Sequence, residues 1–395
     1  MTCYEDLVFR GLIKDMTNNE DFIEKLNNGG MTFYIGTDPT ADSLHLGHLS
    51  SFLICERLAR YGHHPIVLVG GATGLIGDPR PTKERETSNI DIINKNVEGI
   101  KNQLAKYFPN CEMVNNYEWT KDVTYIEFLR EYGKYFNINY MINKDIIKRR
   151  LDEGISYTEF SYMLMQAYDF LWLYEHKNCV MQVAGQDQWG NITSGVELIR
   201  KKLDKEAYAF TMPLVTTKSG VKFGKSEGNA LWLDKDKTSP YDMYQYLINS
   251  EDEMVIDYLK RFTFLSHDEI CELETKHKLA PEKREAHKAL AFEVVKFLHG
   301  EEEAIKARET SEKIFSGEIV QDMPTIIVAD FSGNIMDLMV ATSLAPSKSE
   351  ARRLIVQGGV SVDGEKILDP NKEIDEKELV IQKGKKRIVR VIIED

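Results

Sequence analysis

Short apolar segments alternate with longer amphipathic stretches through the first half of this 395-residue chain. The apolar segments are TFYIG (32–36), PIVLVG (65–70), CEMV (111–114), CVMQVAG (179–185) and FTMPLV (210–215). Because strands that alternate with helices usually pair in parallel, this pattern predicts an α/β fold with a doubly wound parallel sheet. Ligands of such sheets bind beyond the carboxyl ends of the strands, where the loops of this chain are rich in Gly, Asp and Thr.

The second half of the chain has a different character. Residues 240–315 are charged and helix-favouring, and residues 334–395 contain a helix and several short strands with glycine turns. A chain of 395 residues is too long for one ordinary hydrophobic core. We therefore predict an α/β domain at residues 1–226, an α-helical domain at 227–320 and a small α+β domain at 334–395.

Charge and hydrophobicity narrow the class of protein. Hydrophobic residues make up 42% of the chain and charged residues 29%, which is typical of a folded, soluble protein. No apolar run approaches the roughly 20 residues that span a bilayer, and the acidic N-terminus has no signal-peptide pattern. The five cysteines form no C-x-x-C pair, so we expect free thiols, a cytoplasmic protein and no zinc site. A net charge of −13 disfavours indiscriminate binding of polyanions but allows local basic surfaces.

The stretch PTADSLHLGH (39–48) reads as the start of a helix. Asp42 or Ser43 is expected to cap that helix, and the spacing places His45 and His48 on one face of its first turn. Backbone N–H groups and the helix dipole favour an anion at such a position, so the stretch is suited to a polyphosphate. By itself, however, an H-x-x-H spacing is more often two surface histidines without a shared function.

A second basic signal lies downstream, in KFGKS (222–226). Lys222 and Lys225 lie three residues apart on a glycine-containing loop after a strand, where they can grip a pyrophosphate. Thr40 adds a donor to the histidine stretch, and Gly47 removes a side chain that would block a flat group lying against the helix. Together the two stretches predict a nucleotide site.

Two common nucleotide motifs are absent. A Walker A loop needs a glycine where this chain has Ser219, and Gly220 comes one residue too late. The stretch GGATGLIGD (70–78) does not contain G-x-G-x-x-G, so no dinucleotide fingerprint is present.

Several stretches in order along the chain resemble the bacterial tyrosyl-tRNA synthetases, which are class I aminoacyl-tRNA synthetases: YIGTDPTADSLHLGH, GLIGDP, YMLMQAYDF, GQDQWGNI and KFGKS. The resemblance runs from about residue 5 to the C-terminus. It implies a Rossmann-like catalytic domain and a tyrosine–tRNA ligase, which activates L-tyrosine with ATP to tyrosyl-adenylate and pyrophosphate. Tyrosine then passes to the 3′ end of tRNA(Tyr) for protein synthesis. Mg²⁺ would accompany ATP without a dedicated metal site on the protein.

The resemblance also implies the residues that hold tyrosine. Tyr34 and Asp169 match the pair that binds the substrate hydroxyl, which needs both a donor and an acceptor. Asp78, Tyr162 and Gln166 match the groups around the ammonium, and Gln188 is expected near the reacting carboxylate. The spacing of Tyr162, Gln166 and Asp169 places all three on one face of a single helix.

For ATP, the resemblance implies contacts with Asp38, Gly47, Gly185, Asp187 and Lys225. Asp187 is expected to accept hydrogen bonds from the ribose. The residues assigned to catalysis are Thr40 and His45 at the γ-phosphate, His48 on the adenosine side, and Lys222 and Lys225 at the pyrophosphate. A mobile loop in the family adds a Lys and an Arg, for which Lys83 and Arg85 are candidates, although GDPRPTKERE departs from the usual pattern.

The C-terminal segment resembles an S4-type RNA-binding domain. Ser347 and Glu350 have capping-box spacing at the start of a helix. The candidate RNA contacts are basic residues on this helix and on the last basic stretch: Arg352, Arg353, Lys385, Lys386 and Arg387. Phosphate contacts need local cations and not a basic chain, although a solubilising basic tail is the alternative.

Relatives are homodimers through the region around residues 120–160, so a homodimer is expected here. The run YIEFLREYGKYFNINYMI (125–142) fits such an interface and fits a core equally well. Three other functions share part of the pattern: a tryptophanyl-tRNA synthetase, an inactive RNA-binding paralogue and a small-molecule nucleotidyltransferase. The first lacks an S4 domain, the second would not need intact HLGH and KFGKS stretches, and the third gives no reason for the C-terminal domains.

Overall fold

The computed structural model describes residues 1–78, 89–144, 147–148, 154–221, 223–226, 229–316, 325–329, 331, 333–384 and 387–394. The chain forms two compact units. The first consists of Met1–Lys237 with Ile256–Glu272, and the second of Thr238–Val255 with Leu273–Asp395. Within the described ranges no helix is both long enough and apolar enough to cross a membrane.

A five-stranded parallel sheet forms the centre of the first unit, in the order β3-β2-β1-β4-β5. Its strands are β1 (Thr32–Thr37), β2 (His64–Val69), β3 (Glu112–Asn115), β4 (Cys179–Gly185) and β5 (Tyr208–Met212). The predicted doubly wound α/β sheet is therefore confirmed. β5 begins and ends earlier than the predicted 210–215, and its end at Met212 reflects Pro213, which has no N–H for a sheet hydrogen bond.

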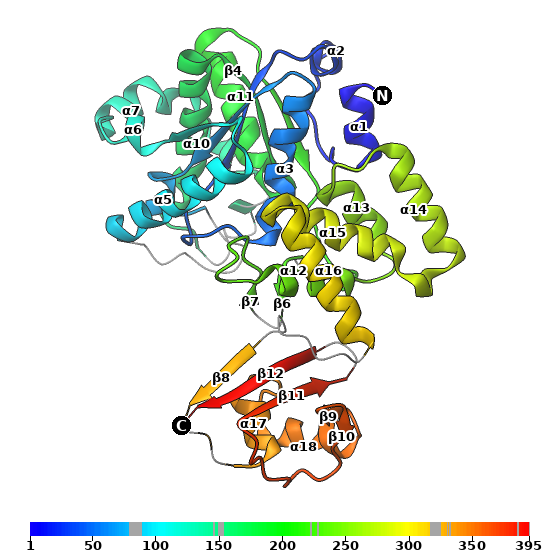
Figure 1. Ribbon diagram of the computed structural model, residues 1–395. Helices are drawn as coiled ribbons and strands as arrows, with labels where there is room; N and C mark the ends of the chain where they lie inside the picture. The colour runs from blue at the N-terminus through cyan, green and yellow to red at the C-terminus, as the bar shows by residue number, and fades with distance from the viewer. Residues whose placement is uncertain are drawn as a thin grey trace. The chain divides into compact units, whose positions relative to one another are not determined.

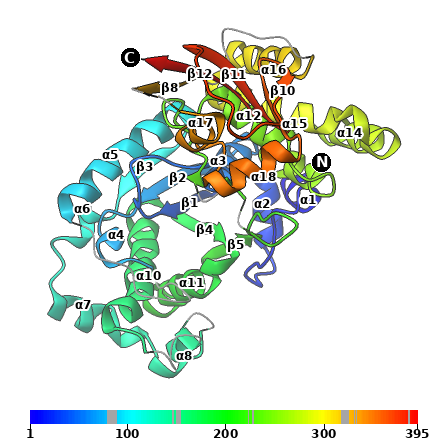
Figure 2. The same ribbon diagram turned by 90° about the horizontal axis from the view of Figure 1, so that it is seen from below.

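Helices cover both faces of this sheet (Figure 2). The long helices are α3 (Leu46–Arg60), α5 (Ile90–Tyr107), α10 (Tyr157–Lys177) and α11 (Trp189–Leu203). α10 and α11 pack side by side on one face, and α3 lies on the other face (Figure 2). The strand order reverses between β1 and β4, and in doubly wound sheets a crevice for ligands opens at that point.

Shorter elements complete the first unit. They are α1 (Cys3–Phe9), α2 (Phe22–Asn28), α4 (Thr73–Ile76), α6 (Tyr117–Thr120), α7 (Tyr125–Glu131), η1 (Gly133–Tyr135), α8 (Ile138–Ile142), η2 (Gln186–Gln188), β6 (Lys225–Ser226) and β7 (Asn229–Ala230). α13 (Val255–Phe262) and α14 (His267–Leu279) contribute residues to both units. β6 and β7 form a small antiparallel pair.

The second unit contains a group of helices and a small sheet (Figure 1). α12 (Pro240–Ile248), α15 (Glu285–His299) and α16 (Glu301–Ser316) pack together, and η3 (Pro281–Lys283) precedes α15. The sheet has the order β10-β9-β11-β12-β8. Its elements are β8 (Thr325–Ala329), α17 (Ile335–Ala341), α18 (Lys348–Val356), β9 (Val360–Val362), β10 (Glu365–Lys366), β11 (Glu378–Lys383) and β12 (Arg387–Glu394). The predicted helical and α+β regions are both present.

Candidate active site

The start of α3 differs from the sequence-based expectation. His45, and neither Asp42 nor Ser43, is the N-cap residue of α3, and its Nδ1 accepts the Gly47 N–H at 3.1 Å. The His48 Nδ1 in turn accepts the His45 N–H at 3.4 Å. The two imidazole rings stack with their centroids 3.8 Å apart, so the predicted histidine pair does share one face.

Hydrogen bonds with residues 231–233 explain why α3 begins later than predicted. The Leu46 N–H donates to the Leu231 carbonyl at 2.7 Å, and the Leu233 N–H donates to the Leu44 carbonyl at 2.9 Å. These strand-like hydrogen bonds hold the backbone extended at His45, so the helix begins only at Leu46 and not at residue 42 or 43. The segment that follows KFGKS thus fixes where the histidine stretch becomes helical.

The HLGH and KFGKS stretches also touch each other through glycines. A Cβ on Gly224 would lie 2.7 Å from the Gly47 nitrogen, and Gly224 has φ of +90°. A Cβ on Gly47 would lie 3.2 Å from the Phe223 carbonyl oxygen and 2.9 Å from the His45 ring. The space beside Gly47 is therefore filled by the chain itself, which is a reason for glycine that local sequence does not reveal.

Several predicted cations lie outside the described residues: Lys83, Arg85, Lys222, Lys385 and Lys386. Of Lys225, at the start of β6, and of Arg387, at the start of β12, only the backbone is described. Arg352 and Arg353 are exposed on α18, and Arg353 forms an ion pair with Glu350 at 2.6 Å. The roles given to all of these residues stay predictions.

A cavity of about 270 Å³ opens at the carboxyl ends of β1 and β4. It brings together most of the described residues predicted for tyrosine and ATP, namely Tyr34, Asp38, Thr40, His48, Asp78, Tyr162, Gln166, Asp169, Asp187 and Gln188. Among the fully described residues predicted for tyrosine, ATP and catalysis, His45, Gly47 and Gly185 do not line it. A Cβ on Gly185 would meet the Asp187 carboxylate at 2.7 Å, so this glycine lets the Asp187 side chain lie against the backbone.

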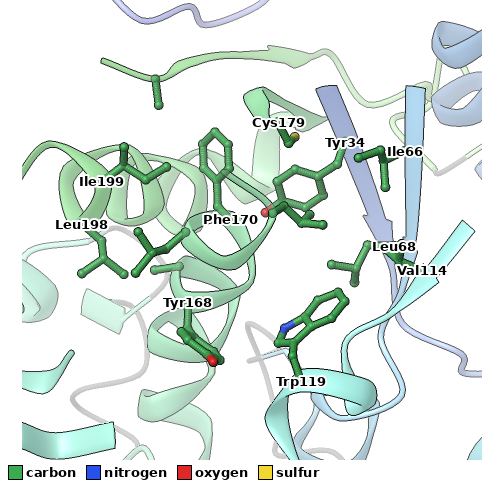
Figure 3. Close-up of a cluster of buried hydrophobic side chains, with 14 residues drawn as sticks. Tyr34, Ile66, Leu68, Val114, Trp119, Tyr168, Phe170, Cys179, Leu198 and Ile199 are labelled. Atoms are coloured by element: carbon green, nitrogen blue, oxygen red, sulfur yellow. The ribbon is translucent and has the colours of Figure 1, made fainter. Parts of the chain in front are cut away.

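Tyr34 and Asp169 lie at the buried end of this cavity. The Tyr34 side chain belongs to the cluster of buried hydrophobic residues in Figure 3 and is 1% exposed. Its hydroxyl has no hydrogen-bond partner among the described residues. Burial, followed by the nearby Asp169 carboxylate, raises the pKa of Tyr34 well above its usual value. The phenol therefore stays protonated, as a buried donor without an acceptor, which is unfavourable unless a ligand supplies one.

Asp169 is held in place by two donors. Its Oδ1 accepts the Trp119 Nε1–H at 2.9 Å, and its Oδ2 accepts the Asn116 Nδ2–H at 2.9 Å. Burial raises the pKa of Asp169 to about 7, against the two hydrogen bonds, which favour the charged form. The Asp169 carboxylate thus has a fixed orientation. Asp169, which can accept a hydrogen bond, and the Tyr34 hydroxyl, which can donate one, line the same cavity.

Carboxyl groups gather at the more open part of the cavity. Gln188 and Asn191 donate to the two oxygens of Asp78 at 2.8 and 3.2 Å, and burial raises the pKa of Asp78 to about 6. The Tyr162 hydroxyl donates to Asp38 at 3.1 Å. Asp38 contributes to the raised pKa of both Asp78 and Asp169. Such a concentration of like charge favours a cationic group, for example an ammonium.

Four residues that orient these carboxylates, and one further residue that lines the cavity, were not predicted from the sequence: Thr73, Asn116, Trp119 and Asn191, and Gln182. Thr73 donates to Asp38 at 2.9 Å, and Asn116 donates to Thr73 at 3.1 Å as well as to Asp169. The amide oxygen of Gln182 is buried without a partner among the described residues. Two signals could have found some of them: Asn116 lies two residues beyond the predicted strand 111–114, and Gln182 is a polar residue inside an otherwise apolar predicted strand.

Two family models match the sequence. The model described as tRNA synthetases class I (W and Y) matches residues 26–316, and the tyrosine–tRNA ligase SYY-like C-terminal domain matches residues 316–391. The chain is 45% identical to a tyrosine–tRNA ligase 1 of Bacillus cereus over 98% of this chain and 99% of that protein. It is 44% identical to a tyrosine–tRNA ligase of Listeria monocytogenes over 98% of both chains.

A solved structure agrees with these matches. The C-terminally truncated mitochondrial tyrosyl-tRNA synthetase of Aspergillus nidulans superposes with a TM-score of 0.71 and 32% sequence identity. The superposition covers 79% of this chain and 94% of that chain.

Proposed function

This chain belongs to the class I tRNA synthetases (W and Y) and catalyses tyrosine–tRNA ligation, and from this premise we propose that the cavity at the carboxyl ends of β1 and β4 is where tyrosine is activated. The substrates are L-tyrosine, ATP and tRNA. The observation that carries the proposal is the Tyr34 hydroxyl, which is buried, protonated and without a partner among the described residues, beside the fixed carboxylate of Asp169. A substrate phenol would accept from Tyr34 and donate to Asp169, which satisfies both groups.

The rest of tyrosine fits the other groups of the cavity. The substrate ammonium would lie among Asp78, Tyr162 and Gln166, where the carboxyl groups gather. The Gln188 amide, which donates to Asp78, would contact the substrate carboxylate. Asp38 and Asp187 would take the adenosine side, with Asp187 accepting hydrogen bonds from the ribose.

The first chemical step needs no protein nucleophile. The tyrosine carboxylate attacks the α-phosphorus of ATP, forms the tyrosyl-adenylate and releases pyrophosphate. The protein contributes positioning and positive or hydrogen-bonding groups around the phosphates. We assign Thr40, His45 and His48 to this role at the start of α3, with Lys222 and Lys225 on the pyrophosphate. Gly47 would serve the ATP site indirectly, by allowing the KFGKS backbone to approach α3, and Gly185 by allowing the Asp187 side chain to lie against the backbone. Lys83 and Arg85 remain candidates for a further phosphate contact.

In the second step the 3′-terminal ribose of tRNA takes the tyrosyl group and AMP leaves. Mg²⁺ would enter bound to the phosphates of ATP and add positive charge there. Within the described residues no cluster of His, Cys, Asp or Glu is arranged to hold a metal, so no protein ligand is assigned to the ion.

We further propose that the C-terminal region binds tRNA. A local group of cations can bind RNA phosphates even when the net charge of the chain is negative. The residues proposed to contact the phosphates are Arg352, Arg353, Lys385, Lys386 and Arg387. The proposed domains are a catalytic domain at 1–226, with a dimer-interface insertion around 120–160, an anticodon-arm domain at 227–320 and an S4-like domain at 334–395. The cellular location that fits these substrates is the cytoplasm.

A homodimer is the proposed assembly. An apolar patch on α7, α8 and the start of α10, which we call the α7–α8 patch, leaves six large side chains exposed: Tyr125, Ile126, Leu129, Ile138, Tyr140 and Tyr157. Ile126 is 76% exposed. Beneath the patch, Phe128 and Met141 pack on Met163 of α10, so the exposed face rests on a fixed base. Exposed apolar and aromatic side chains of this kind are typical of an interface with a second copy.

Amino-acid-dependent exchange of labelled pyrophosphate into ATP tests the proposed site. Each of the standard amino acids is supplied in turn to the full-length protein. We expect strong exchange with tyrosine and poor exchange with phenylalanine and tryptophan, because only tyrosine pairs with both Tyr34 and Asp169. Exchange of equal strength with tryptophan would contradict the assignment of the cavity.

A further inference from the structure

A short hairpin leads into the KFGKS stretch, and its described residues are 215–221 and Phe223. The Phe223 N–H donates to the Val215 carbonyl at 3.0 Å, and the Thr217 N–H donates to the Val221 carbonyl at 2.8 Å. Gly220, with φ of +81°, lies at the turn. A two-stranded hairpin is only marginally stable by itself in water, so its position depends on what packs against its base.

One side chain contacts both arms of this hairpin at its base. Tyr258, on α13, is 1% exposed, and its hydroxyl donates to the Thr216 carbonyl on the first arm at 3.0 Å. Its ring packs against the ring of Phe223 on the second arm, with centroids 4.2 Å apart. Phe262, one turn further along α13, also contacts Phe223, at 5.2 Å between centroids.

α13 is in turn fixed to α3, the helix that His45 caps. Arg57 of α3 donates to the Thr263 carbonyl, just beyond the end of α13, at 2.9 Å. Arg10 donates to the carbonyls of Lys260 and Thr263, at 3.0 and 3.2 Å. Both arginines are buried and lie beside the Asp6 carboxylate. α13 therefore forms a rigid link between α3 and the base of the hairpin.

We propose that Tyr258 is a positioning residue for tyrosine activation, because it holds the KFGKS segment in register with the start of α3. The inference rests on the proposed function, in which the lysines of KFGKS hold the pyrophosphate. Without the Tyr258 anchor the hairpin would sample more positions, and interactions made in the transition state would be lost. Tyrosine binding should not change, since neither Tyr258 nor Phe223 lines the cavity.

A residue that only stabilises the fold would affect tyrosine binding and activation together. The test compares Tyr258→Phe, which removes the hydroxyl, with Tyr258→Leu, which also removes the ring. Tyr174→Phe is the matched control, because the Tyr174 hydroxyl also donates to a backbone carbonyl, that of Glu206, at 3.2 Å. Three quantities are measured in the full-length protein: the dissociation constant for tyrosine, the rate of tyrosyl-adenylate formation with the KM for ATP, and hydrogen exchange of the hairpin amides.

For Tyr258→Phe we expect the rate of adenylate formation to fall about fivefold, the typical effect of losing one neutral hydrogen bond. The KM for ATP should rise, tyrosine affinity should stay within about twofold, and Tyr258→Leu should show a larger loss of the same kind. The Thr217, Gly220 and Phe223 amides should exchange faster in both variants and not in Tyr174→Phe.

Unchanged hairpin exchange in Tyr258→Leu, or parallel losses of tyrosine affinity and activation, would overturn the inference. Because hydrogen exchange needs no substrate, it tests whether Tyr258 holds the hairpin in place independently of the proposed function. If the wild-type protein failed to form adenylate while the hairpin amides behaved as expected, the proposed function would be wrong and the anchor would stand as a structural contact.

Discussion

Gly224 and Gly47 lie in backbone contact, with no space for a methyl group between them: a Cβ on Gly224 would come within 2.7 Å of the Gly47 nitrogen. The two stretches that identify the nucleotide site are thus in contact in the folded chain, and glycine at both positions permits it. The geometry depends on Leu231 as well, whose N–H donates to Gly224 and whose carbonyl accepts from Leu46.

Gly224→Ala should therefore disrupt activation more than a matched glycine change. The control is Gly220→Ala, since Gly220 also has positive φ, +81° against +90°, but a Cβ on Gly220 would meet no described atom within 4 Å. Both variants carry a backbone strain of about 1–3 kcal/mol, and only Gly224→Ala adds the clash with Gly47. Rates of tyrosyl-adenylate formation measure the difference. Equal losses in the two variants would show that the close contact is unimportant.

Tyrosine affinity should rise with pH between about 5 and 8. The raised pKa values of Asp78, about 6, and Asp169, about 7, mean that both carboxyls are partly protonated in the lower part of this range. The substrate ammonium and hydroxyl favour the ionised forms of these two carboxyls. At low pH tyrosine binding must therefore release protons from them, whereas at high pH the carboxyls are already ionised and no proton is released.

Calorimetric titration with tyrosine, in buffers of different ionisation enthalpy, measures both the affinity and the protons released. Asp78→Asn should weaken binding and remove the part of the pH dependence that is centred near pH 6. An affinity that stays constant from about pH 5 to 8, without proton release, would contradict this account of the two carboxyls.

Ile126→Glu should convert the proposed dimer to a monomer. The Ile126 side chain is 76% exposed in the single chain, and a dimer would bury the introduced charge against a second apolar surface. Ile92→Glu is the control, because Ile92 is 55% exposed on α5, outside the α7–α8 patch. Sedimentation velocity at several concentrations gives the result. A wild-type protein that is monomeric at all concentrations would contradict the proposed interface.

Replacing Arg352 and Arg353 by Gln should weaken tRNA binding while leaving pyrophosphate exchange unchanged. Arg200→Gln is the control, since Arg200 and Arg353 are 62% and 63% exposed and each pairs with a glutamate three residues earlier. Each lost phosphate contact should lower the slope of log Kd against log salt by about 0.7–0.9. An unchanged slope would mean that these arginines do not contact the tRNA backbone.

The sheet was predictable from the sequence because each of its strands is a short apolar run between amphipathic helices. Cys179–Gly185 matches its predicted strand at both ends, and β1 differs from its prediction only by Thr37. The first turn of α3 was not predictable in the same way. Local residues favoured a cap at Asp42 or Ser43, whereas hydrogen bonds from residues 231–233, far along the chain, keep the backbone extended up to His45.

In the cavity, too, residues close together in the sequence could be predicted as neighbours, whereas residues far apart in the sequence could not. Tyr162, Gln166 and Asp169 line it from a single helix, as their spacing predicts. Asn116 and Trp119 orient Asp169 from a different part of the chain, and no spacing rule links residues about 50 positions apart. Their roles become visible only when the fold brings β3 and α6 next to α10.

The central claim is that Tyr34 and Asp169 select tyrosine through its hydroxyl group. The most direct measurement is kcat/KM for pyrophosphate exchange with tyrosine and with phenylalanine, in the wild-type protein and in Tyr34→Phe. Tyr34→Phe should lower the preference for tyrosine by about fivefold, through loss of one hydrogen bond to the substrate, without impairing the use of phenylalanine. Its melting temperature should not fall, because the hydroxyl that is removed is buried and unpaired among the described residues. A preference for tyrosine that is the same in both proteins would contradict the claim.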